Sequence, residues 1–144
     1  MDDYDYPISE SIENELVTLA GDSNSSILRD MKQLLGVEEG SSNFDRDVII
    51  HTNGAIFSLL QLGIGPKKGF SIKGYDEIWS DLIPDRIDLE GAKTYLYFCA
   101  RLSFDPPQMG YYVTLMERQR DETAWRLVHQ IEDGEGGEEN VDNN

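Results

Sequence analysis

Apolar residues recur at helical spacing along most of the chain, which predicts an all-α fold. A first firm helix is expected over residues 26–35, where apolar positions follow the i, i+4, i+7, i+8 pattern and Ser25 or Ser26 can cap the start. A second is expected over residues 45–62, with Asp45 as its N-cap and a broad apolar face. Weaker helical spacing over residues 9–20 allows one more short helix.

The Asn53-Gly54 pair is in conflict with the second helix, because it is also a turn signal for a β-hairpin. The apolar residues around it recur at three and four positions rather than at two, which favours a helix. A glycine inside a helix costs about 1 kcal/mol relative to alanine. We therefore expect close packing against another helix at Gly54.

Two helices are expected in the third quarter of the chain. A short one that contains Trp79 lies between Asp76, its N-cap, and Pro84, which ends it. A longer one begins after Asp88, its N-cap, and is broken by Asp105-Pro106-Pro107. Nearly the whole circumference of this longer helix is apolar, which predicts burial at the centre of the fold or against other subunits.

A last helix is expected over residues 109–131, where apolar positions flank a stretch of paired charges. The alternation of Phe70-Ser71-Ile72 allows one short strand or hairpin. The predicted fold class is thus all-α: a small helical bundle of four to five helices, with room for a short β-hairpin and with acidic flexible termini.

Acidic residues are concentrated at both ends of the chain. Of the 28 acids among 144 residues, six lie in residues 1–15 and six in residues 132–144, where no base occurs. The body holds the other 16 acids and all 12 bases, so most of the net charge of −16 belongs to the ends. We expect a weakly structured segment over residues 1–25, one helical domain over 26–131, and a disordered tail over 132–144. That tail either keeps the protein soluble or orders on a partner.

Composition argues against several classes of function. A strongly negative protein is a poor ligand for phosphate backbones and for anionic membranes. One cysteine excludes an internal disulfide and a cysteine-cluster zinc site. No apolar run approaches the roughly 20 residues of a membrane helix. The acidic start lacks the apolar core of a signal peptide, so we expect the protein to stay where it is made.

Signals for catalysis are weak. His51 follows Asp47 by four residues, a spacing that could orient an imidazole as a general base, but no motif supplies a nucleophile. The loop with Lys67-Lys68 lacks the spacing of a phosphate-binding loop. Cys99 lies on an apolar face typical of a core residue. We expect no enzyme activity, no metal and no cofactor.

The aromatic residues of the last two helices indicate protein–protein contacts instead. They are more numerous than one small core requires, and tyrosine and tryptophan are typical anchors of interfaces. Trp125 is accordingly either a core residue or such an anchor. The aromatic set consists of Tyr95, Tyr97, Phe98, Phe104, Tyr111, Tyr112 and Trp125.

Several short motifs follow one another in an order more specific than any one of them. The strongest are Lys93-Thr94-Tyr95, then Phe104-Asp105-Pro106-Pro107, then Trp125-Arg126-Leu127. Earlier ones are Phe44-Asp45-Arg46-Asp47 and Gln61-Leu62-Gly63-Ile64-Gly65-Pro66. In this order, residues 27–131 resemble the tailed-phage head–tail connector family, also called head-completion or adaptor proteins. The chain departs from that pattern at Asn53-Gly54 and in its added termini.

The resemblance implies a structural virion protein, made in the host cytoplasm, that forms a ring of about twelve copies at the neck. The ring would dock on the portal protein after DNA packaging and carry the stopper or tail-completion protein. DNA would pass through its channel without specific binding, and no membrane would be involved. By analogy, the candidate portal-binding residues are Arg118, Arg120, Trp125, Arg126 and His129. The candidate ring-interface residues are Asp47, His51, Tyr95, Tyr97, Arg101, Tyr111 and Tyr112.

Two other hypotheses stay open from the sequence. An acidic DNA mimic would inhibit a nucleic-acid enzyme, but it needs an ordered negative face, whereas much of this charge lies at the ends. A small enzyme would depend on His51. The ring adaptor ranks first, since a net-negative channel wall would also let a DNA duplex slide.

Overall fold

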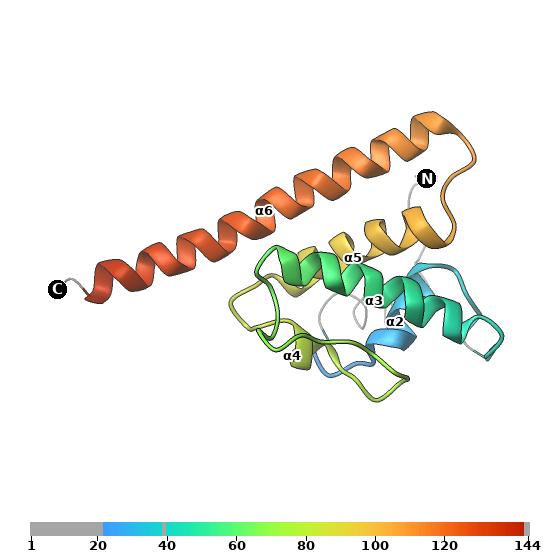
Figure 1. Cartoon of the computed structure of the whole chain (residues 1–144), viewed down its shortest axis with the longest axis horizontal. Helices are drawn as coiled ribbons and strands as arrows, with labels where there is room; N and C mark the ends of the chain where they lie inside the picture. The colour runs from blue at the N-terminus through green and yellow to red at the C-terminus, as the bar shows by residue number, and fades with distance from the viewer. Residues whose placement is uncertain (1–21, 39, 143–144) are drawn as a thin grey trace, which may run out of the picture.

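Five helices make up the part of the chain that the structure describes (Figure 1). This computed structural model describes residues 22–38 and 40–142, with side chains as far as Asp133. The all-α bundle expected from the sequence is confirmed, while the short helix expected over 9–20 lies outside the described residues. The helices are α2 (Ile27–Leu34), α3 (Asp45–Gln61), α4 (Trp79–Leu82), α5 (Leu89–Phe104) and α6 (Gly110–Asp142).

The α5 helix lies between α3 and α6, and α2 packs against α3 (Figure 1). The α6 helix follows α5 and then runs past the rest of the body (Figure 1). The core lies where the inner faces of these helices meet, with Trp79 of α4 fully buried among them. Core residues from the other helices include Ile27, Met31, Val48, Ile56, Leu59, Ala92, Leu96, Ala100 and Leu127.

Two of the four expected helix caps are confirmed. The side chain of Ser26 accepts from the backbone of α2, and Asp88 accepts from the backbone of α5. The cap predicted at Asp45 is wrong, because its carboxylate forms an ion pair with Lys32 at 2.7 Å instead. The cap predicted at Asp76 is also wrong, since α4 starts only after Ile78 and has no side-chain cap.

The strand allowed at residues 70–72 is wrong, since the described residues contain no strand. The side-chain amide of Asn53 takes the place of a neighbouring strand. It donates to the carbonyl of Ile72 at 3.0 Å and accepts from the N–H of Ile72 at 2.8 Å. Asn53 therefore holds the loop that contains Ile72 against α3. It lies inside a helix and forms no hairpin turn.

A buried charged residue of α2 joins three parts of the core. The Asp30 carboxylate has no exposed surface, and it accepts from the indole N–H of Trp79 at 2.7 Å and from the hydroxyl of Ser25. The Lys93 ammonium of α5 lies 3.5 Å from it and 5.0 Å from the centre of the Trp79 ring. Burial lowers the pKa of Lys93, although the nearby Asp30 carboxylate opposes that shift.

A second buried lysine holds α2 against the start of α3. Lys32 donates to the Tyr75 hydroxyl and to the Ser41 carbonyl, both at 2.8 Å, beside its ion pair with Asp45. Burial would lower the pKa of Lys32, but the hydrogen bonds to Asp45 and Tyr75 outweigh it and raise the pKa. The hydrogen bond from Lys32 in turn lowers the pKa of Asp45.

The α6 helix continues to Asp142, beyond the end expected near Ile131. Leu127 and Ile131 are buried in the core, whereas Glu132 and Asp133 are exposed. The apolar spacing thus predicts where α6 stops packing against the core. It does not predict where the helix ends, because backbone hydrogen bonds continue α6 beyond that point. The three-part division of the chain expected from its charge stays a prediction.

Candidate interaction surfaces

The outer face of α6 is the side of this helix turned away from α5. Its residues recur at three- and four-residue spacing, and every one of them is exposed. The inner side carries the buried Leu127 and Ile131. The outer face of α6 consists of Tyr111, Thr114, Arg118, Glu122, Trp125, His129 and Glu132.

Trp125 is the largest side chain of this face and is 63% exposed. The imidazole of His129 packs edge-on against the indole, with ring centroids 4.1 Å apart. Beside them, Arg126 donates to Glu122 at 2.8 Å. An exposed tryptophan surrounded by polar side chains is typical of an interaction hot spot. The core alternative for Trp125 is therefore wrong, and the anchor alternative remains.

A second exposed surface runs along α3. Two of its side chains are large and apolar, Ile50 at 56% exposed and Phe57 at 62%. Gly54 lies between them, and a Cβ placed there would meet nothing within 4 Å. The close packing expected at Gly54 is therefore wrong within the subunit, because the glycine faces outward. The α3 stripe consists of Asp47, Ile50, Gly54, Phe57 and Gln61, all exposed.

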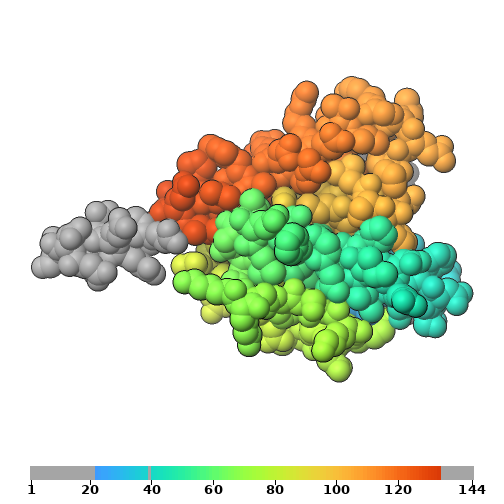
Figure 2. All heavy atoms as spheres, viewed as in Figure 1, coloured from blue at the N-terminus to red at the C-terminus, as the bar shows by residue number. Residues whose placement is uncertain are grey.

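A groove of about 490 Å³ lies beside the α3 stripe, between α3 and α6. Tyr95 and Cys99 of α5 line it, and the space-filling view in Figure 2 has α5 between the other two helices. Arg120 lines the α6 side, held by Asp121 at 3.0 Å. Burial raises the pKa of the Cys99 thiol, so at neutral pH it is a protonated, weakly reactive group.

His51 contacts a residue of α5 that no sequence motif singled out. Its Nδ1 lies 2.8 Å from the Ser103 hydroxyl oxygen, and its ring packs edge-on against Phe104 with centroids 5.5 Å apart. The Ser103 hydroxyl also donates to the Ala100 carbonyl at 3.2 Å, and the imidazole tautomer decides which of His51 and Ser103 donates in their contact. The contact ties α3 to α5.

The seven candidate ring residues lie on three helices and differ in exposure. Tyr95 is 6% exposed and belongs to the core, whereas Tyr111 is 69% exposed. The exposed members are Asp47, Tyr111 and Tyr112, and the half-buried ones are His51, Tyr97 and Arg101.

The five candidate portal residues all lie on α6, and four of them are exposed. Arg120 differs, because it is half-buried and lines the groove beside α5. The exposed four are Arg118, Trp125, Arg126 and His129.

Ile50 and Phe57 are surface residues that the sequence predictions missed. The helical pattern was assigned from the apolar positions that face the core, and these two lie outside that face. A signal for them exists in the sequence: they are seven residues apart, and polar or small residues at the same spacing, Asp47, Gly54 and Gln61, flank them.

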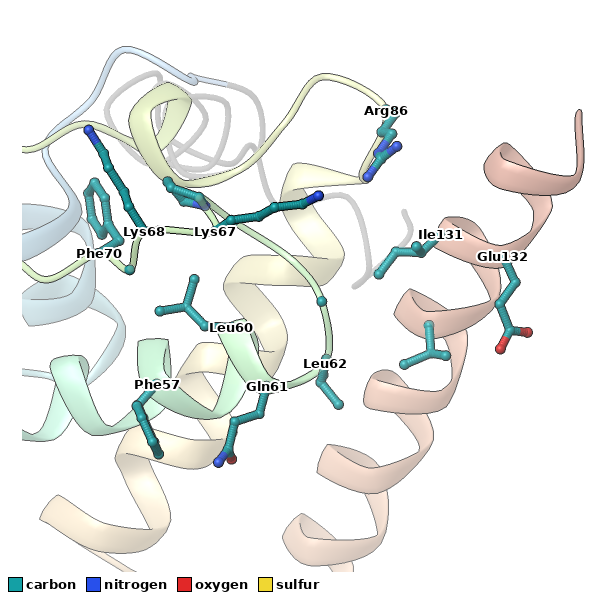
Figure 3. Close-up of a pocket in the computed structure, with 15 residues that line it drawn as sticks. Phe57, Leu60, Gln61, Leu62, Lys67, Lys68, Phe70, Arg86, Ile131 and Glu132 are labelled. Carbon is teal, nitrogen blue, oxygen red and sulfur yellow. The ribbon is translucent and has the colours of Figure 1, made fainter. Parts of the chain in front are cut away.

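A further groove lies where the loop after α3 meets α6 (Figure 3). Lys67 extends toward the side of Arg86 and Ile131, while Lys68 points away from them, beside Phe70 (Figure 3). The two lysines thus diverge, whereas a phosphate cradle needs donors that converge on one point. This agrees with the sequence of the loop, which lacks the spacing of a phosphate-binding loop.

Large apolar side chains exposed on two helix faces of a small helical body are typical of a protein that works by assembly with other proteins. Across the described residues, no helix is long and apolar enough to cross a membrane, and no group of three potential metal ligands occurs.

A sequence model of the phage connector protein family matches residues 27–134. Because this match covers most of the chain, the protein belongs to the phage connector protein family, and the resemblance found from its motifs is confirmed. Comparisons with curated proteins and with solved structures gave no match. Family membership suggests a structural connector in the virion, in contact with other head and tail proteins, rather than an enzyme.

Proposed function

We propose that this protein assembles into a ring at the head–tail junction of a tailed phage. The ring docks on the portal protein after DNA packaging and provides the platform for the stopper or tail-completion protein. It extends the DNA channel without binding a particular DNA sequence. The C-terminal part of α6 makes the portal contact.

One observation carries the proposal: a single subunit exposes two surfaces with large apolar side chains among polar ones, the outer face of α6 and the α3 stripe. Every copy in a closed ring needs two different complementary patches, because ring contacts are heterologous, whereas a symmetric dimer needs only one. Trp125 on one surface and Ile50 and Phe57 on the other are each more than half exposed. Such side chains are the usual anchors of protein interfaces.

The shape of α6 supports the portal contact. Its 33 residues give a rod of about 50 Å, and its C-terminal end projects past the body (Figure 1). A projecting helix can enter a groove of a partner without any rearrangement of the core it comes from. Glu132 and Asp133, at the start of the projecting part, are exposed and acidic, which favours a basic site on the portal.

The test is assembly with the portal protein of the same phage, followed by sedimentation velocity and negative-stain microscopy. We expect rings stacked on the portal. A variant truncated after Asp133 keeps the buried Leu127 and Ile131, so it is expected to fold and to lose portal binding. A chain that stays monomeric and never sediments with portal would contradict the proposal.

A further inference from the structure

Gly54 in the α3 stripe has no explanation within the subunit. A glycine inside a helix is destabilising by about 0.5–1 kcal/mol relative to alanine. Apart from its own helix backbone and chain neighbours, nothing lies within 4 Å of a Cβ placed there, so no close approach by another part of the subunit requires a glycine. It leaves a notch between the exposed side chains of Ile50 and Phe57, and the groove lined by Tyr95 and Cys99 opens beside it.

Trp125 on the outer face of α6 has the complementary shape. It is a large, flat, apolar side chain, 63% exposed, on a helix whose inner side is already packed on its own core. We infer that α6 of one copy packs on the α3 stripe of the neighbouring copy, with the Trp125 indole in the Gly54 notch. This inference rests on the proposed ring and names the contact between its subunits.

Sequence spacing fixes the register of this contact. Seven residues separate Asp47 from Gly54, and seven separate Arg118 from Trp125, which is about 10.5 Å along each helix. If the two helices run in the same direction, Arg118 therefore lies opposite Asp47 when Trp125 lies over Gly54. Both side chains are exposed and carry opposite charge. An arginine–carboxylate pair then forms at the edge of the apolar contact.

The antiparallel arrangement is disfavoured by charge. It places Glu132, seven residues after Trp125, opposite Asp47, so that two carboxylates meet. The arrangement of one subunit also favours the parallel direction, since α3 and α6 share a general direction within a copy (Figure 1). Neighbours in a ring of about twelve copies differ by a rotation of about 30°, which largely preserves that direction.

In this register, Arg118 and Trp125 on the outer face of α6 contact the neighbouring copy. The resemblance to connectors had implied that these two residues contact the portal instead. The projecting end of α6 beyond Glu132 remains for the portal. The two assignments predict different effects of the same variants, because loss of a subunit contact weakens the ring itself.

Charge exchange tests the pair. Asp47→Arg and Arg118→Asp are each expected to raise the chain concentration needed for half-maximal assembly at least about ten-fold. The double variant is expected to recover assembly. Lys73→Asp is the matched control, since Lys73 is exposed in the loop between α3 and α4 and belongs to neither of the two surfaces. If the double variant assembles no better than either single variant, the proposed ion pair between Asp47 and Arg118 of neighbouring copies is wrong.

Disulfide trapping tests the direction, in a Cys99→Ala background so that no other thiol is present. The Asp47→Cys/Arg118→Cys variant is expected to give a ladder of covalently linked copies under oxidation. The Asp47→Cys/Glu132→Cys variant is expected to give none. A ladder from the second variant and none from the first would overturn the parallel register.

Filling the notch separates folding from assembly. Gly54→Leu is expected to raise the melting temperature of the subunit, because it removes a helix glycine at an open position. It is also expected to weaken assembly at least about ten-fold. Normal assembly of this variant would refute the proposed contact between Trp125 and the Gly54 notch of the neighbouring copy.

Portal binding distinguishes the remaining outcomes. If Arg118→Asp and Trp125→Ala form normal rings but fail to bind portal, the inference fails and the proposed function stands. If the wild-type chain forms no ring, alone or with portal, both fail.

Discussion

Asp30→Ala is the most direct perturbation of the buried polar network. It removes a fully buried carboxylate that accepts from Trp79 and Ser25 and lies 3.5 Å from the Lys93 ammonium, and it leaves those groups in place. Breaking a buried ion pair from one side costs about 3–5 kcal/mol. A buried N–H that loses its acceptor costs about 1–3 kcal/mol by itself. We expect the free energy of unfolding to fall by about 3–5 kcal/mol, or roughly 10 °C in Tm.

Urea unfolding, followed by circular dichroism on dilute monomeric chain, measures this loss. Asp30→Asn keeps an oxygen that can accept from Trp79 but loses the charge, so an intermediate loss is expected. Asp85→Ala is the control, because Asp85 is exposed and its removal is expected to cost less than about 0.5 kcal/mol. If Asp30→Ala loses less than about 1 kcal/mol, the network does not stabilise the fold and the reasoning is refuted.

Three other predictions concern stability. Trp125→Ala is expected to change the free energy of unfolding of the monomer by less than about 0.5 kcal/mol, because Trp125 is exposed. Trp79→Ala is expected to lower it by about 3–5 kcal/mol, because Trp79 is fully buried. Equal effects of the two variants in thermal melts would contradict this difference in burial. Because Lys32 holds the pKa of Asp45 below 3.8, that pair contributes stability above pH 3.8 which is lost as the pH falls through the folded pKa. Acid titration of unfolding should therefore show a weaker pH dependence in Asp45→Asn. Gly65→Ala is expected to cost about 1–3 kcal/mol in thermal melts, since φ is +113° and the new Cβ would lie 2.6 Å from the Leu60 side chain; a neutral effect would refute this strain.

Helix positions were predictable because they follow from local spacing. The start of α5 at Leu89 and its end before Pro106 depend on a capping aspartate and on proline sterics, which act within a few residues. The connector resemblance was likewise a matter of residue order. The exposure of Trp79 and Trp125 was not predictable in this way, because each has both apolar and polar neighbours in the chain. Only the packing of other helices decides that one is fully buried and the other 63% exposed.

Side chains with distant partners account for most of the errors. Asp45 was assigned a cap because aspartate at a helix start usually caps it, but Lys32 of another helix competes for the same carboxylate. Asp30 and Lys93 carry charge and are buried, which local hydropathy does not predict. For the candidate surfaces, the sequence located the exposed part of α6 and Asp47 of the α3 stripe. It missed Ile50 and Phe57, since an apolar side chain is assumed to face the core.

The hydrogen bonds of Asn53 have a consequence for the chemical lifetime of the protein. Asparagine followed by glycine is the sequence most prone to deamidation, in which the glycine nitrogen attacks the side-chain carbonyl. Here both amide atoms of Asn53 are held by Ile72, and the N–H of Gly54 belongs to the helix ladder. The reaction therefore requires α3 to open locally. Asn53 therefore deamidates only while this part of α3 is locally unfolded. Assembled copies are expected to deamidate more slowly than free ones.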